Sequence, residues 1–306
     1  MYIQKLWWLF LPALLIIVAV IMVKINIYPQ NNNFKINDSH SADPIITRNT
    51  APTSKVNVHG VPVLIYHIIS SDTIKGSYGF MPLSLFKAQL DYLKQEEYVT
   101  ITLDDLYDHM TFGKNIPEKA IVLSFDDTNE TDYTIAFPEL KKRGLSGVFF
   151  TVGSKANTIL WKQRLQEMHS AGMEIASHTM NHKYSGGGPS TKGKRIEVDN
   201  EQTIRYELSN SKETLENIIG SRVNYLAWPG DSYTENMINI ARELGYKGLF
   251  MAKTDYTENV MEHPLSKSGF NKAGDDVFYI RRITINGSDS FDDFKAVLND
   301  GIYPRS

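Results

Sequence analysis

The sequence predicts an α/β barrel of seven or eight strand–helix units, preceded by an N-terminal transmembrane helix. Short apolar, β-branched runs alternate with helical patterns from residue 61 onward, which indicates a parallel sheet covered by helices. The number of units favours a closed barrel over an open sheet. Polar side chains that could carry chemistry follow directly after predicted strands, where the active sites of such barrels lie. These side chains are His67, Asp126, Asp127 and His178.

Residues 1–24 predict a signal anchor that crosses the membrane. Leu6–Val23 is a run of 18 residues without a charge, and Lys5 and Lys24 flank it. Roughly 20 apolar residues are needed to span a bilayer. No small-residue cleavage pattern follows the run, so an uncleaved anchor is favoured over a cleaved signal. We expect a single-pass protein of the cell membrane with an extracellular catalytic domain, or a secreted protein if the segment is removed.

Residues 25–58 predict a flexible extracellular linker. Asn, Ser, Thr and Pro are frequent there and no helical periodicity is present, as is typical of tethers. The globular domain is therefore expected at residues 59–306.

Within this domain, short apolar runs predict the strands. Apolar residues three or four apart, closed by glycine, predict the helices. Thr102 and Asp105 form a capping box that starts an amphipathic turn. Residues 183–200 predict a Gly-rich loop beside the carboxyl ends of the barrel strands, where the active site is expected. Strands are expected at residues 61–69, 98–102, 120–125, 146–152, 173–177, 225–228, 247–252 and 279–285, and helices at 85–96, 132–143, 161–171, 201–219, 235–244 and from 290 onward.

The composition excludes several classes of function. The formal net charge is −3, from 32 Lys and Arg against 35 Asp and Glu, so no basic excess indicates nucleic-acid binding. The chain has no cysteine, which removes disulfides, thiol catalysis and thiolate metal sites. A metal site in this chain must use His, Asp or Glu.

Two motifs predict metal chemistry. Asp126 and Asp127 end a strand, and adjacent carboxylates point in different directions, so one can bind a metal while the other faces an attacking water. His178 and His182 are four residues apart, which on an extended strand is about 13 Å. Because a bound metal lies about 2 Å from each nitrogen, the chain must turn after His178. Two imidazoles and one carboxylate leave open positions for water and substrate.

Other motifs admit two interpretations. His67 ends the first predicted strand and is either a ligand-facing residue or a core histidine. The Trp228-Pro229-Gly230 segment ends a strand, and Trp228 is either a pocket wall or part of that turn. Three further histidines, in helical or loop contexts without partners, are expected at the surface: His109, His169 and His263.

Taken in order, the YH, SFDD, SHTMNH, AWPG and late RRI motifs resemble those of the polysaccharide deacetylases, the NodB-homology domain of carbohydrate esterase family 4. The likeness covers roughly residues 60–300. It is greatest to the subgroup acting on poly-β-1,6-N-acetyl-D-glucosamine, the exopolysaccharide of biofilms. The resemblance implies a distorted barrel of the NodB-homology type that removes N-acetyl groups from this polymer at the cell surface.

The resemblance also implies a role for each matching residue. Asp126 matches the catalytic base and His67 the general acid. Asp127, His178 and His182 match the ligands of one divalent ion. The substrate is expected against Trp228, Pro229, Gly230 and Arg282. Zinc is the first expectation for the ion, and cobalt, nickel and manganese accept the same ligands.

The expected partners are an N-acetylglucosamine polysaccharide, the membrane, and polysaccharide synthase or export machinery, with no nucleic acid.

Three alternative functions stay open. The chain is a peptidoglycan or chitooligosaccharide N-deacetylase, an acetylxylan O-esterase, or an inactive glycan-binding surface protein. The intact Asp126, Asp127, His178 and His182 argue against the last of these.

Overall fold

The computed structural model describes residues 57, 59–71, 79–183, 200–252 and 269–301. The predicted anchor at residues 1–24, the predicted linker at 25–58 apart from Asn57, and residues 184–199 of the Gly-rich insertion lie outside these ranges. Within them, no helix combines the length and the apolar character needed to cross a bilayer.

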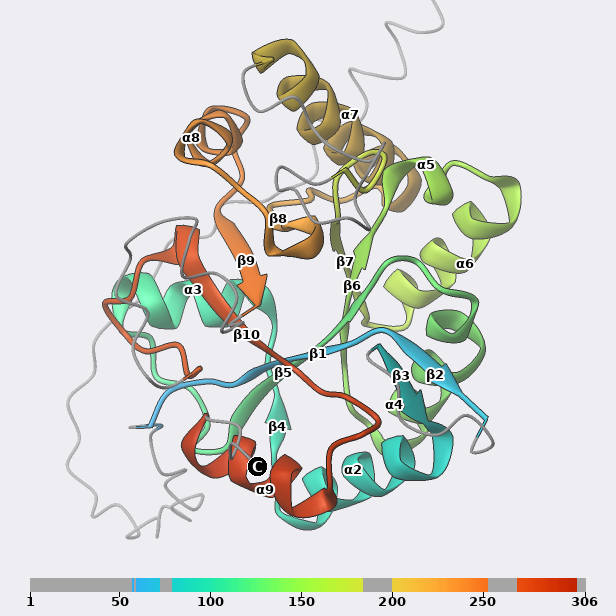
Figure 1. The fold of residues 1–306 in the computed structure, drawn as a ribbon, viewed down its shortest axis with the longest axis vertical. Coiled ribbons are helices and arrows are strands. Elements are labelled where there is room, and N and C mark those ends of the chain that lie inside the picture. The colour runs from blue at the N-terminus through green and yellow to red at the C-terminus, as the bar shows by residue number, and fades with distance from the viewer. Residues whose placement is uncertain (1–56, 58, 72–78, 184–199, 253–268, 302–306) are drawn as a thin grey trace, which may run out of the picture. The chain divides into compact units, whose positions relative to one another are not determined.

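Seven parallel strands form a closed barrel, which confirms the predicted fold class (Figure 1). The ring closes because β1 pairs with both β10 and β5, and the short β4 (Val99–Thr100) pairs along the start of β5. Around the ring the order is β1 (Val63–Tyr66), β10 (Ile280–Thr284), β9 (Gly248–Ala252), β8 (Tyr225–Ala227), β7 (Glu174–Ser177), β6 (Val148–Thr151) and β5 (Ala120–Asp126).

Helices surround the barrel, and their ends follow local sequence signals (Figure 1). The predicted capping box at Thr102 is present, and Gly144 and Gly220 end their helices with φ of 64° and 70°, a conformation that glycine adopts without strain. The helices are α2 (Leu83–Gln95), α3 (Leu103–Phe112), α4 (Phe137–Arg143), α5 (Gly153–Ala156), α6 (Ile159–Ser170), α7 (Glu201–Ile219), α8 (Glu235–Glu243) and α9 (Phe291–Asp300).

The first predicted strand is interrupted at His67. Beyond this residue, β2 (Ile68–Ser70) leaves the ring and pairs with β3 (Phe80–Pro82). The break places His67 at the carboxyl end of β1. Neither β3 nor the four-residue α5 was predicted, because such short runs show no periodicity.

The helix predicted at residues 132–143 begins as a π-helical turn, η1 (Asp132–Ala136), before it continues as α4. Pro138 has no N–H to donate to Thr134, so the regular α-helical pattern cannot form there. Turns of this type are frequent beside functional sites, and this one follows the Asp126-Asp127 segment.

Alternation along the strands separates an apolar core from a polar layer. In β5, Leu123 and Phe125 point outward and pack with buried residues of the surrounding helices. Val122 points to the other side and packs with residues of several other strands. Asp126 lies four residues beyond Val122 and therefore faces the same interior side. Arg282 of β10, which β1 separates from β5 in the ring, also reaches this layer, with its guanidinium 4.9 Å from the centre of the Phe150 ring.

The prediction that His109 lies at the surface was wrong. His109 is 7% exposed, and its Nδ1 lies 2.8 Å from the carbonyl oxygen of Lys114. It shares a helical face with Leu106 and Met110, which are buried. His169 is half-buried, with Nε2 3.1 Å from Ser221 Oγ. His263 lies outside the described residues.

Glu174 should make stability depend on pH. Its carboxylate accepts a 2.9 Å hydrogen bond from Leu103 N at the start of α3, and burial raises its pKa from 4.5 to about 7. The folded protein therefore binds this proton more tightly than the unfolded chain. The resulting stability is fully present below about pH 4.5 and is lost as the pH rises through 7.

Glu174→Gln keeps a carbonyl oxygen for Leu103 N and removes the titrating group. Between pH 5 and 7.5, we expect the melting temperature of the wild-type protein to fall by a few degrees relative to that of this variant. Parallel melting curves at every pH would contradict the assignment.

Candidate active site

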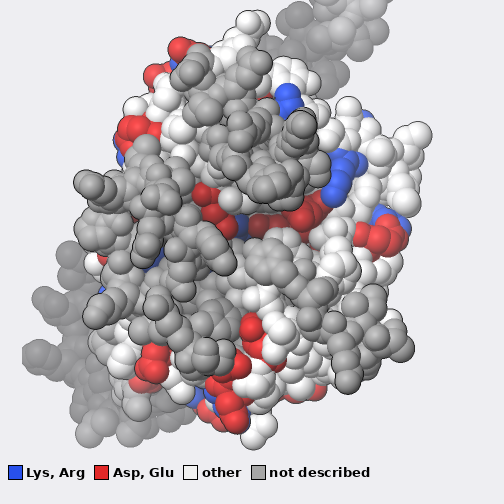
Figure 2. Space-filling view, in the orientation of Figure 1, with Lys and Arg blue, Asp and Glu red and all other residues white. Residues whose placement is uncertain are grey.

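The carboxyl ends of the strands open into one pocket of about 290 Å³. The space-filling view is hollowed at its centre, where Asp and Glu side chains gather (Figure 2). Every site residue predicted from the sequence except Pro229 lines this pocket: His67, Asp126, Asp127, His178, His182, Trp228, Gly230 and Arg282.

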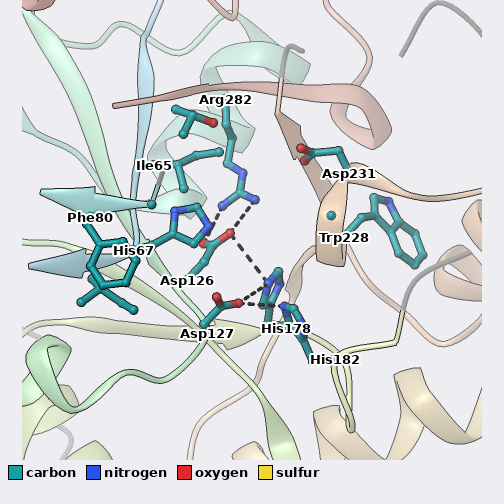
Figure 3. Close-up of a pocket in the computed structure, with 14 residues that line it drawn as sticks. Ile65, His67, Phe80, Asp126, Asp127, His178, His182, Trp228, Asp231 and Arg282 are labelled. Carbon is teal, nitrogen blue, oxygen red and sulfur yellow. Dashed lines mark hydrogen bonds and ion pairs between the residues drawn. The ribbon is translucent and has the colours of Figure 1, made fainter. Parts of the chain in front are cut away.

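Asp127, His178 and His182 lie close enough together that they could hold one metal ion (Figure 3), and we call them the ligand set. Asp127 Oδ1 lies 2.7 Å from His182 Nε2 and 3.3 Å from His178 Nε2. One ligand atom from each residue lies within 4.8 Å of the other two. Burial raises the pKa of Asp127, but its hydrogen bonds to the two histidines outweigh burial and hold the pKa far below its ordinary value. The carboxylate is therefore ionised.

The protonation of His178 suits metal binding. Its Nδ1 lies 2.9 Å from the carbonyl oxygen of Ala227, and because a carbonyl only accepts, Nδ1 carries a proton. In the neutral ring, Nε2 then presents its lone pair toward Asp127. Burial lowers the pKa of His178, but the nearby carboxylates of Asp126 and Asp127 outweigh this and raise it. The surroundings thus favour a cation at Nε2.

Asp126 is held by a buried arginine. Both of its oxygens accept from the guanidinium of Arg282, at 2.7 and 2.9 Å, and the two residues are 3% and 1% exposed. Burial raises the pKa of Asp126, but the charge of Arg282 outweighs it and holds the pKa below the ordinary value. Asp126 Oδ2 also lies 3.8 Å from His178 Nε2. This carboxylate is therefore ionised, fixed in orientation and adjacent to the ligand set.

His67 lies on the β1 side of Asp126, and the close-up shows its ring between Phe80 and Arg282 (Figure 3). It is half-buried and lines the same pocket as Asp127, His178 and His182. The interruption of the first strand at His67 produces this position.

The Trp228-Pro229-Gly230 segment lies at the pocket, but the ring of Trp228 does not form the pocket wall that was expected of it. The indole of Trp228 is fully buried and stacks on Tyr233, with ring centres 6.3 Å apart. Figure 3 shows the ring directed away from the ligand set. Pro229 is also buried, whereas Gly230 is exposed.

Backbone strain is concentrated at the site. Of six non-glycine residues with positive φ among the described residues, five belong to the loops that carry the site. Such conformations cost about 1–3 kcal/mol each and persist only where the surroundings enforce them. These five residues are Asp127 (81°), Thr128 (58°), Thr179 (62°), His182 (55°) and Asp231 (53°).

Six residues that line the pocket were not predicted as site residues, and two of them are Phe80 and Asp231. Phe80 comes from the unpredicted β3, and Asp231 follows Gly230. Asp231 Oδ1 accepts a hydrogen bond from Ala252 N at 2.5 Å, and burial raises its pKa. Asp231 lies four residues beyond the end of β8, so its position is a weaker signal than that of Asp126, which ends β5.

Comparisons with known proteins agree with this geometry. Residues 113–249 match the model of the polysaccharide deacetylase family. A putative polysaccharide deacetylase of Bacillus subtilis, YxkH, is 28% identical over 190 residues, which are 61% of this chain and 62% of that protein. A poly-β-1,6-N-acetyl-D-glucosamine N-deacetylase of Staphylococcus aureus is 26% identical over 191 residues, 60% of this chain and 64% of that protein. The matches thus span less than two thirds of these curated relatives.

Solved structures share the fold. The Streptococcus pyogenes deacetylase PplD superposes with a TM-score of 0.64 at 21% identity, over 78% of this chain and 98% of that one. IcaB from Ammonifex degensii superposes with a TM-score of 0.60 at 21% identity, over 79% of this chain and 97% of that one. Residues 113–249 thus match the polysaccharide deacetylase family, and the solved structures share the barrel fold of this chain.

Proposed function

We propose that this protein is a metal-dependent N-deacetylase of poly-β-1,6-N-acetyl-D-glucosamine. The observation that carries the proposal is the convergence of Asp127, His178 and His182 on one point, beside a carboxylate that Arg282 holds ionised. The S. aureus relative supports the substrate, since its name assigns that activity to it.

The donor set fits one divalent ion. Two imidazole nitrogens and one carboxylate oxygen lie close enough to share it, the tautomer of His178 is set by Ala227, and zinc, cobalt, nickel and manganese all accept such ligands. An ion held by these three residues would supply polarisation of an acetamide carbonyl and a lowered pKa of a water.

Two residues of the protein carry out the proton transfers. Asp126 accepts the proton of the water that attacks the acetyl carbon, and Arg282 keeps both oxygens of Asp126 in place. His67 gives a proton to the nitrogen as the carbon–nitrogen bond breaks. The products are acetate and the free amine of a glucosamine unit.

Gly230 is the donor that we assign to the developing oxyanion. Trp228 N donates to Phe250 O, Asp231 N donates to Trp228 O, and Pro229 has no N–H. Among the described residues of this segment, the N–H of Gly230 is therefore the one that stays available next to the pocket.

Acetate release from defined oligosaccharides tests the substrate. The full-length protein with added Zn²⁺ should release acetate from β-1,6-linked N-acetylglucosamine oligomers faster than from β-1,4-linked chitooligosaccharides, peptidoglycan fragments or acetylated xylan. A preference for β-1,4-linked substrates would replace the proposed polymer while leaving the chemistry intact. Binding of the oligomers without acetate release would indicate an inactive glycan-binding protein.

We also propose that residues 1–24 anchor the domain to the cell membrane through the linker at 25–58, with residues 59–306 outside. This placement would bring the domain close to the machinery that exports the polysaccharide. Protease treatment of intact cells should remove the domain and leave the anchor in the membrane fraction, whereas a protected domain would contradict the proposed orientation.

A further inference from the structure

The loop that carries His182 turns sharply and contains strained backbone. His178 and His182 have ring centres 4.8 Å apart, so the four intervening peptide units reverse the chain. Thr179 and His182 both have positive φ, 62° and 55°. Because each such residue costs free energy, contacts from outside the loop must maintain the turn.

Glu207 of α7 supplies three of these contacts. Its Oε2 accepts from Asn181 N at 2.7 Å, and its Oε1 accepts from Asn181 Nδ2 at 2.8 Å. Its backbone carbonyl accepts from Met180 N at 2.9 Å. The two residues immediately before His182 are thus bonded to one residue of a helix outside the barrel.

Other contacts hold different parts of the loop. From α5, Gly153 N donates to Thr179 O at 3.0 Å, and Ser154 N donates to Met180 O at 2.8 Å. His182 N donates to Thr179 Oγ1 at 3.1 Å. Among the hydrogen bonds of the described residues, those that reach Asn181, the residue next to His182, come from the carboxylate of Glu207.

Burying the charged side chain of Glu207 costs free energy that packing alone would not require. Its side chain is fully buried, although Asn181 itself is exposed. Lys183 Nζ lies 3.7 Å from its Oε1. A buried carboxylate loses hydration that an ion pair repays only in part, and an apolar residue usually stabilises such a position as well. The charge is better explained by the short hydrogen bonds that it makes to the loop.

We propose that Glu207 is a positioning residue that holds His182 in ligand geometry and thereby sets the affinity of the site for its divalent ion. The inference rests on the proposed metal site and adds a residue 25 positions away from His182 in the sequence. Glu207 acts through the backbone N–H and the side-chain amide of Asn181.

Metal titration of the full-length protein in detergent tests this proposal. After metal is stripped, Zn²⁺ binding is measured by calorimetry, and Co²⁺ binding by its visible absorption spectrum. Glu207→Ala should weaken Zn²⁺ binding by about 10- to 100-fold, the usual effect of losing a residue that orients a ligand, and should alter the Co²⁺ spectrum. Glu207→Gln should weaken binding less, because one oxygen acceptor for Asn181 N is kept. Raising Zn²⁺ should restore acetate release by Glu207→Ala.

Glu216→Ala is the matched control. Glu216 lies on the same helix and accepts from a backbone N–H, that of Val223, at 3.0 Å, away from the His182 loop. This variant should lower the melting temperature and leave Zn²⁺ affinity unchanged. If Glu207→Ala does not fold, Glu207→Gln and Asn181→Ala carry the same test.

Two results would count against the inference in different ways. If the Glu207 variants bind Zn²⁺ as tightly as the wild-type protein, Glu207 has a structural role only, and the proposed function stands. If the wild-type protein itself binds neither Zn²⁺ nor Co²⁺, the proposed metal site is wrong and this inference falls with it.

Discussion

Replacing Asp127 with alanine should abolish both metal retention and acetate release. Asp127 contributes the single carboxylate of the ligand set, and its Oδ1 lies close to both histidine Nε2 atoms. A metal ion contributes several kcal/mol to the stabilisation of a transition state, and each 1.36 kcal/mol is tenfold in rate. We therefore expect kcat/KM to fall by about 10³-fold or more, as measured by acetate release at a fixed Zn²⁺ concentration.

Asp104→Ala is a suitable control for this change. Asp104 also has defined partners, the hydroxyl of Tyr225 at 2.5 Å and Lys247 Nζ at 3.1 Å. These contacts lie at the amino end of β8, away from the pocket. The control should keep one bound ion and full turnover. An Asp127→Ala protein that retained its metal and its activity would show that the ligand set is misassigned.

Asp126→Asn should keep the metal and lose most of the turnover. The substitution preserves shape and leaves the three ligand residues in place, but an amide cannot accept a proton from water. Loss of a general base typically costs about 10²- to 10⁴-fold in rate. Metal content and acetate release measured on the same preparation separate this result from that of Asp127→Ala. A variant with wild-type turnover would exclude Asp126 as the base.

The same substitution should destabilise the fold. Arg282 is 1% exposed and forms a bidentate ion pair with Asp126. Removal of one partner of a buried pair usually costs about 3–5 kcal/mol, because the other charge is left uncompensated. For a domain of this size we expect the melting temperature to fall by roughly 6–20 °C, so activity must be assayed well below it. An unchanged melting temperature would contradict the importance of the ion pair.

Much of the fold followed from local patterns. The α7 helix has the bounds expected from its periodicity and closing glycine, and the capping box at Thr102 formed as predicted. Such features depend on neighbouring residues alone. The break at His67 did not follow, because the continuous apolar run conceals that β2 leaves the ring to pair with β3.

The candidate site shows a similar division. Asp126, Asp127 and His178 were visible as polar residues at strand ends, and His182 was visible by its spacing from His178. The bidentate contact of Arg282 with Asp126 and the hold of Glu207 on Asn181 were not, since each joins segments that are distant in the sequence. The burial of Trp228 depends on its packing against Tyr233, which no pattern around Trp228 indicates.

The central claim is that Asp127, His178 and His182 bind one divalent ion on which acetate release depends. The most direct measurement determines the metal content and the acetate release of the same full-length preparation, before and after chelation and after Zn²⁺ is returned. We predict one ion per chain, loss of acetate release on chelation, and its recovery with Zn²⁺. Full activity in a preparation shown to contain no metal would contradict the claim.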